Sequence, residues 1–202
     1  MPHGALYSGI ILNAALGARF GMRKFVAGVL ATVAFLALGG LGAALLGFLP
    51  TNANSTPPRL EARLAMSALD ASVDRHAPRG NSPVAATDEN LIEGIKIYTM
   101  NCAGCHGGID RHPVDFGRSF YPPAPNLILH PPDDPESHVF YVIRTGVRYT
   151  GMPSWEAVLS EQDMWKVTAF LTRVEKLPPG VQDYWRKTAG VEPPSGNHEG
   201  HE

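Results

Sequence analysis

Residues Cys102-Ala103-Gly104-Cys105-His106 decide how the rest of this 202-residue sequence is interpreted. Cys102 and Cys105 are its two cysteines. A framework of structural disulfides needs more pairs than this, and a four-ligand zinc site needs a second pair of cysteines or histidines at matching spacing, which is not evident in the sequence. The motif therefore indicates a site built on one pair of thiols and the histidine that follows them.

The order Cys-x-x-Cys-His is typical of covalent attachment of a c-type haem. A helical turn sets the separation of the two thiols, which bond the two haem vinyl groups, and His106 then projects its imidazole at the iron. The alternative, a thioredoxin-like redox pair, requires a strand–helix–strand pattern around the cysteines. The sequence has a helical pattern before Cys102 and a proline-rich loop after Cys105, so we expect one covalently attached haem c.

A second iron ligand is expected downstream, because a methionine opposite the histidine is the arrangement of cytochromes c. Met152 is the best candidate, since it lies on a loop defined by Gly151 and Pro153. The weaker candidates are Met164, expected in the core, Met100, which is too close to Cys102, and His130 and His138, both expected at the surface. His198 and His201 near the end could bind a metal, but a disordered terminus is the stronger interpretation of that segment.

The run from Phe25 to Leu49 contains no charged residue and is longer than the roughly 20 residues that a helix needs to cross a bilayer. Arg19, Arg23 and Lys24 precede it, which predicts a cytoplasmic N-terminus and a periplasmic remainder at the bacterial inner membrane. The alternative is a cleaved signal peptide, whose apolar core is usually shorter, at about 7–15 residues. Whether the chain starts at Met1 or Met22 also stays open.

Helical periodicity, capping residues and proline positions predict an all-α chain. Four further helices are expected. The first covers 59–76, with Leu60, Leu64, Ala68 and Leu69 on its apolar side, and the second covers 88–101 after a Thr87 or Asp88 cap. The third covers 139–145, between a Ser137 cap and a stop at Gly146, and the last begins after a Ser160 cap. The expected segments are a cytoplasmic stretch 1–24, an anchor 25–49, a linker with an amphipathic helix 50–86, a haem domain 87–178 and a partly disordered tail 179–202. The helix over 59–76 has three open placements: on the membrane surface, on the haem domain or in solvent as a spacer.

The stretch from Asp88 to Val174 resembles a class I c-type cytochrome domain, of the membrane-anchored bacterial monohaem kind. Gly94 and Tyr98 lie eight and four residues before the first cysteine, as in that family, and a later helix offers Phe170 as the residue that crosses the first helix. Gly151-Met152-Pro153-Ser154-Trp155 is similar to its methionine loop.

The resemblance implies a cytochrome c fold of three to four helices around one haem, with Cys102 and Cys105 as thioether sites and His106 and Met152 as axial ligands. It also implies that a proline carbonyl holds the histidine. Pro125 is closest to that segment, although Pro113, Pro122 and Pro123 leave the choice open. Trp155 is expected to pack near the haem, with an ordinary core tryptophan as the alternative.

These features predict a membrane-tethered electron carrier, not an enzyme, serving respiratory or dehydrogenase partners. A six-coordinate iron leaves no open position for a substrate. The net charge of −2 gives no reason to expect nucleic acid, and residues 88–176 carry 12 acidic and 8 basic side chains, which sets no clear partner preference. The alternatives are a haem gas sensor or small haem enzyme in which Met152 dissociates, and a fixed subunit of a larger respiratory complex.

Overall fold

The computed structural model describes residues 4–112 and 114–195, with side chains described from Met22 onward. The helices are α1 (Gly4–Leu45), α2 (Arg59–His76), α3 (Asp88–Asn101), α4 (Ala103–His106), α5 (Asp115–Arg118), α6 (Glu136–Thr145), α7 (Glu161–Leu171) and α8 (Pro179–Ala189). No strand occurs within the described ranges, which confirms the all-α prediction. The chain divides into two compact units, Met1–Asn52 and Ala53–Glu202.

The first unit contains α1. Its stretch Met22–Leu45 has 24 residues and a mean hydropathy of 2.1, so by length and composition it is able to cross a membrane. At about 1.5 Å of rise per residue, a helix of that length covers the roughly 30 Å hydrocarbon core. The predicted run continued to Leu49, but the helix ends at Leu45, and Gly47 follows with a φ of +78°.

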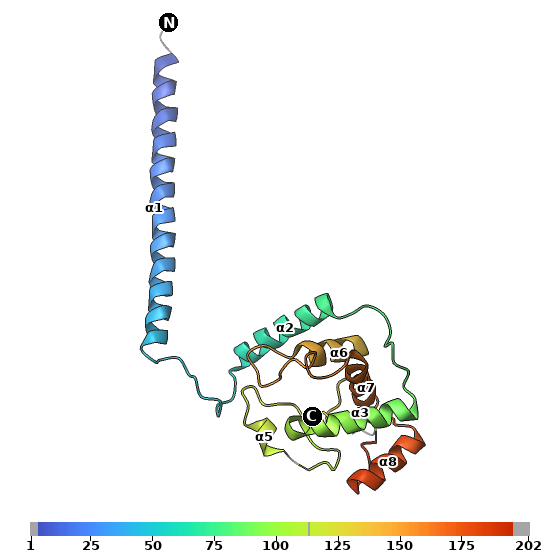
Figure 1. Cartoon of the computed structure of the whole chain (residues 1–202). Coiled ribbons are helices and arrows are strands. Elements are labelled where there is room, and N and C mark those ends of the chain that lie inside the picture. Colours follow the sequence, from blue (N-terminus) through green and yellow to red (C-terminus); the bar gives the residue numbers. More distant parts are fainter. Residues whose placement is uncertain (1–3, 113, 196–202) are drawn as a thin grey trace. The chain divides into compact units, whose positions relative to one another are not determined.

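The second unit is organised by a close crossing of α3 and α7 (Figure 1). A Cβ atom on Gly94 would overlap the backbone oxygen of Lys166 and lie 3.0 Å from Cβ of Phe170. The rings of Tyr98 and Phe170 then meet edge to face, with centroids 5.5 Å apart. The contact expected between Phe170 and the first helix of the haem domain is therefore present, and Gly94 is what lets the two backbones approach.

Capping residues set the starts of the two central helices. Thr87 accepts a hydrogen bond from the backbone nitrogen of Asn90 at 3.3 Å, and Ser160 accepts one from Asp163 at 3.1 Å, as the sequence predicts. The prediction for α6 is wrong at its start. The helix begins at Glu136, directly after Pro135, so Ser137 lies inside the first turn and does not cap it.

Helix α2 packs on α6, and the predicted apolar side is buried only in part, since Leu69 is half-buried one turn before Val73. Val73 is its buried side chain, and His76 stacks on Tyr141 with ring centroids 6.3 Å apart. Leu60 and Leu64, expected on the packed side, are 69% and 62% exposed. Of the three placements that the sequence leaves open, the structure has α2 packed on the predicted haem domain, through α6.

Helix α8 is part of the same core, although the sequence predicts a tail there. Val181 and Trp185 are fully buried, and the Trp185 ring lies 5.9 Å from that of Phe170. The packed fold thus extends beyond residue 178. The end of the predicted tail, with His198 and His201, lies outside the described residues.

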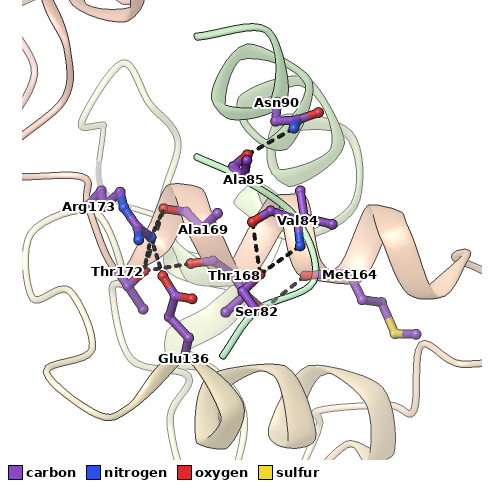
Figure 2. Close-up of polar contacts among 10 residues, drawn as sticks. All are labelled: Ser82, Val84, Ala85, Asn90, Glu136, Met164, Thr168, Ala169, Thr172 and Arg173. Atoms are coloured by element: carbon purple, nitrogen blue, oxygen red, sulfur yellow. Dashed lines mark hydrogen bonds and ion pairs between the residues drawn. The ribbon is translucent and has the colours of Figure 1, made fainter. Parts of the chain in front are cut away.

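The predicted linker before α3 is also ordered against the domain (Figure 2). Asn90 Nδ2 donates to the Ala85 oxygen at 2.9 Å, and Ser82 Oγ donates to the Val84 oxygen at 3.0 Å. Nearby, Arg173, two residues after the end of α7, forms an ion pair with Glu136 at the start of α6. The bond from Asn90 thus ties the chain that leads from α2 into α3 to the first turn of α3.

Candidate functional site

The cysteine motif forms one helical turn at the end of α3. Backbone nitrogens of Cys105 and His106 donate to the Cys102 oxygen at 3.1 Å and 2.9 Å. Both thiols are free and half-buried. The turn therefore brings Cys102, Cys105 and His106 together within one helical turn, as expected from their spacing.

The Cys102 thiol has a raised pKa, whereas the reactive cysteine of a thiol–disulfide enzyme has a lowered one. Burial raises the pKa of Cys102 to about 12, and the neighbouring Cys105 raises it further. Reactive redox cysteines have a lowered pKa, because the thiolate is the nucleophile. The microenvironment therefore argues against the thioredoxin-like alternative.

His106 is fixed at both its ring and its backbone. Its Nδ1 lies 2.9 Å from the Pro125 oxygen, which only accepts, so Nδ1 carries the proton and the Nε2 lone pair is left for a metal. The His106 oxygen accepts bonds from Leu127 N at 2.9 Å and from the Tyr98 hydroxyl at 3.0 Å. Burial lowers the pKa of His106, which favours the neutral imidazole that metal binding needs.

Pro125 is thus the proline whose carbonyl meets the histidine. Pro122 and Pro123 make no such bond in the structure, and Pro113 lies outside the described residues. The adjacent Asn126 closes the same turn, because its Oδ1 accepts from the nitrogens of Ile128 and Leu129 at 3.1 Å and 3.0 Å. The amide of Asn126 fits against Gly107, where a Cβ would lie 2.6 Å from Oδ1.

Met152 is half-buried on a tight loop between α6 and α7, called the Met152 loop (residues 146–154). Its backbone nitrogen donates to Thr150 Oγ1 at 3.0 Å, and its oxygen accepts from Val147 N at 3.1 Å. At the base, Ser154 Oγ donates to the Arg144 oxygen at 2.8 Å. Local bonds therefore fix the shape of the loop that carries the thioether.

The segment around α5, for which the sequence predicts only loop, contacts both the cysteine motif and the Met152 loop. It includes α5, and a Cβ on Gly117 would overlap the Cys105 oxygen. Three residues later, the Phe120 ring packs on Gly151, where a Cβ would lie 2.6 Å from ring atom Cδ1. Helix α5 has only four residues, too few to show a periodic pattern in the sequence.

Trp155 supplies a buried polar atom that has no partner in the described part of the chain. The same is true of Trp165 and Trp185, whose rings lie in the hydrophobic core. Trp155 packs at the edge of that core, three residues after Met152. A buried donor without a partner marks a place where an acceptor is expected, and the carboxylates of a haem are acceptors. Two thiols, one free imidazole nitrogen and a thioether complete a donor set that fits haem c.

The other sequence candidates take no part in this arrangement. Met164 is 3% exposed in the core and Met100 is 75% exposed. His130 is exposed, and His138 Nε2 lies 3.8 Å from Asp74 on α2. Within the described residues, no group of three histidine, cysteine or acidic side chains is placed to hold a metal ion.

Comparison with known proteins gives one family. Residues 89–171 match the family model described as cytochrome C oxidase, cbb3-type, subunit III. The match covers less than half of the chain and includes the motif, the Pro125 segment, the Met152 loop and α7. No curated protein matches the chain.

Proposed function

We propose that residues 89–171, which match the subunit III family model, form a class I c-type cytochrome domain that holds one haem and carries single electrons. Cys102 and Cys105 would carry the haem through thioether bonds, and His106 and Met152 would be the iron ligands. The observation that carries the proposal is the hydrogen bond from His106 Nδ1 to the Pro125 oxygen. It leaves Nε2 as a free ligand beside two unpaired thiols.

When bound, haem c supplies a one-electron couple between ferrous and ferric iron. The chain's own residues set the conditions for that couple. Pro125 orients His106 and makes its imidazole more basic, as such outer partners do for metal-bound histidines. Met152, as the second ligand, would raise the potential. Trp155 is proposed to line the pocket, with its buried N–H available to a haem carboxylate.

The proposed roles are tested by variants at the attachment site. Cys102→Ser and Cys105→Ser should each retain one thioether bond at most, and the double variant should carry no haem after denaturation. His106→Ala should lose the low-spin spectrum of the folded protein. Haem that stays covalently bound in the double variant would rule out these attachment sites.

Electron transfer itself is tested by a spectroelectrochemical titration of the full chain in detergent. A carrier with both axial positions filled should follow a one-electron Nernst curve that is the same in both directions, and its ferrous form should bind carbon monoxide slowly. Rapid binding of carbon monoxide by the folded ferrous protein would instead favour the sensor or small-enzyme alternative, in which Met152 dissociates.

We further propose that α1 tethers the haem domain to the bacterial inner membrane, with the domain on the periplasmic side. The length and composition of Met22–Leu45 support an anchor, and Arg23 and Lys24 support a cytoplasmic N-terminus. Tethering raises the effective concentration of the domain near membrane-bound redox partners. A reporter enzyme that works only in the periplasm should be active when fused after residue 52. Activity of a reporter that works only in the cytoplasm, fused at the same site, would show the opposite topology.

A second arrangement, a fixed subunit of a larger respiratory complex, is favoured by one observation. The matched family is described as a subunit of an oxidase, not as a free carrier. Mild detergent extraction followed by a native gel with haem staining distinguishes the two. A haem band at the mass of the chain alone supports a free carrier with weak, transient contacts, and a band at much higher mass supports the assembled subunit.

A further inference from the structure

Residues 115–121, called the clasp, contact both halves of the proposed haem site. The clasp starts with α5 (Asp115–Arg118) and ends at Tyr121. It lies between the cysteine motif and α6, in the long segment that its glycines and prolines predict to be loop. Its contacts with three other segments give it a definite position.

The first contact is with the cysteine motif. Gly117 is buried, and a Cβ at this position would overlap the backbone oxygen of Cys105. The Gly117 oxygen also accepts a hydrogen bond from Ala124 N at 2.9 Å. The clasp backbone is therefore held directly against the turn that carries the thiols.

The second contact is with the Met152 loop. A Cβ on Gly151 would lie 2.6 Å from Cδ1 and 2.8 Å from Cγ of Phe120, so the ring rests on the α-carbon of Gly151. Phe116 braces that ring edge to face, with centroids 5.0 Å apart. Gly151 immediately precedes Met152, so a shift of the Gly151 backbone would move Met152 through the one peptide unit that joins them.

The third contact is with α2. The Tyr121 hydroxyl donates to Glu61 Oε1 at 2.8 Å, and this hydrogen bond raises the pKa of Tyr121. Since α2 is itself packed on α6, the clasp is supported from outside as well as from the motif. Phe120 therefore projects from a backbone that is held on both sides.

We propose that Phe120 is a positioning residue that holds the Met152 loop closed and keeps the Met152 thioether on the iron. The bonds of Thr150 and Val147 set the shape of the loop, and Ser154 joins its base to α6. Phe120 provides a contact between the loop and the side of the site that carries the cysteines. The inference rests on the proposed function, because it assumes that Met152 is a ligand.

The test compares variants of the full haem-loaded chain in detergent. Phe120→Ala removes the ring, and Phe120→Leu keeps most of its volume. Gly151→Ala places a methyl group where the ring lies, which should push the loop away from the clasp. Tyr149→Ala is the matched control, because it removes an aromatic side chain from the same loop that is 90% exposed.

Three properties are measured in each variant: the weak red absorption band of the methionine–iron bond, the rate of carbon monoxide binding to the ferrous form, and unfolding by circular dichroism. Phe120→Ala and Gly151→Ala should bind carbon monoxide roughly tenfold faster or more, since each factor of ten reflects ~1.4 kcal/mol of lost loop closure. They should also lose the red band at denaturant concentrations well below unfolding. Phe120→Leu should largely restore both properties, and Tyr149→Ala should match the wild type.

Wild-type rates and an unchanged red band in Phe120→Ala, at full haem content, would overturn the positioning role. If Phe120→Ala cannot be produced as a folded protein, wild-type rates and an unchanged red band in Gly151→Ala would overturn the role in the same way. A wild-type protein that already lacks the red band would instead remove the premise that Met152 is a ligand. Failure of the inference is thereby distinguished from failure of the proposed function.

Discussion

The imidazole of His106 and the backbone oxygen of Pro125 are joined by a 2.9 Å hydrogen bond across 19 residues of sequence. The bond fixes the tautomer of His106 and directs Nε2 away from Pro125. It also ties the proline-rich loop to the cysteine motif, together with the bond from Leu127 N to the His106 oxygen. The chain itself therefore fixes the orientation of the imidazole that we propose as an iron ligand.

Tyr98 secures the other side of the same turn. Its buried hydroxyl donates to the oxygens of Gly107 at 2.7 Å and His106 at 3.0 Å. Tyr98→Phe should lower the free energy of unfolding by about 1–3 kcal/mol, because it leaves two carbonyls without this donor. Guanidinium unfolding followed by circular dichroism measures the loss, with haem content as the control. An unchanged midpoint would mean that water replaces the hydroxyl without cost.

Gly94 tests the crossing of α3 and α7. A methyl group there would overlap the Lys166 oxygen, so Gly94→Ala should separate the helices and prevent folding or cost several kcal/mol. The matched control is Gly104→Ala in the cysteine motif, where nothing lies within 4 Å of the added Cβ. The control should attach haem and unfold like the wild type. Equal stability of both variants would contradict the crossing as described.

Trp185 tests whether α8 is part of the fold. It is fully buried, and Trp185→Ala should lower the free energy of unfolding by about 3–5 kcal/mol, the usual cost of deleting a large core aromatic. Trp185→Phe should cost much less. Thermal unfolding at a fixed pH gives the comparison. If removal of residues 179–202 left the unfolding midpoint unchanged, α8 would be a dispensable tail.

Local signals allowed the central helices to be predicted. The caps at Thr87 and Ser160 and the stop at Gly146 depend on a few neighbouring residues, and the structure has them as expected. The cysteine motif and the Gly94–Tyr98 spacing gave the fold for the same reason, since each short pattern requires a specific contact.

Features that depend on packing between distant segments were missed or placed wrongly. The sequence predicts Leu60, Leu64, Ala68 and Leu69 on the apolar side of α2, but its buried side chain is Val73, and Leu60 and Leu64 are exposed. Trp185 lies in the predicted tail, and its burial depends on Phe170, which is 15 residues away in the sequence. Phe120 and Gly151 lie in two different loops, and neither loop has a periodic sequence pattern from which their contact could be predicted.

Met152 is expected to control access to the iron. Met152→Ala should leave the covalent haem in place, abolish the red absorption band, lower the midpoint potential and allow rapid carbon monoxide binding. Redox titration and stopped-flow absorbance measure these changes. Met164→Leu, a change in a core side chain that is 3% exposed, is the control and should alter none of them. Persistence of the red band in Met152→Ala would assign the second ligand elsewhere.

The central claim is that one haem is bonded covalently to Cys102 and Cys105. It is tested most directly by the intact mass of the purified chain after denaturation and acid–acetone extraction, combined with its pyridine haemochrome spectrum. We predict the mass of the chain plus one haem, and a spectrum of the c type. A chain without added mass, or haem that is released into the acetone, would contradict the account.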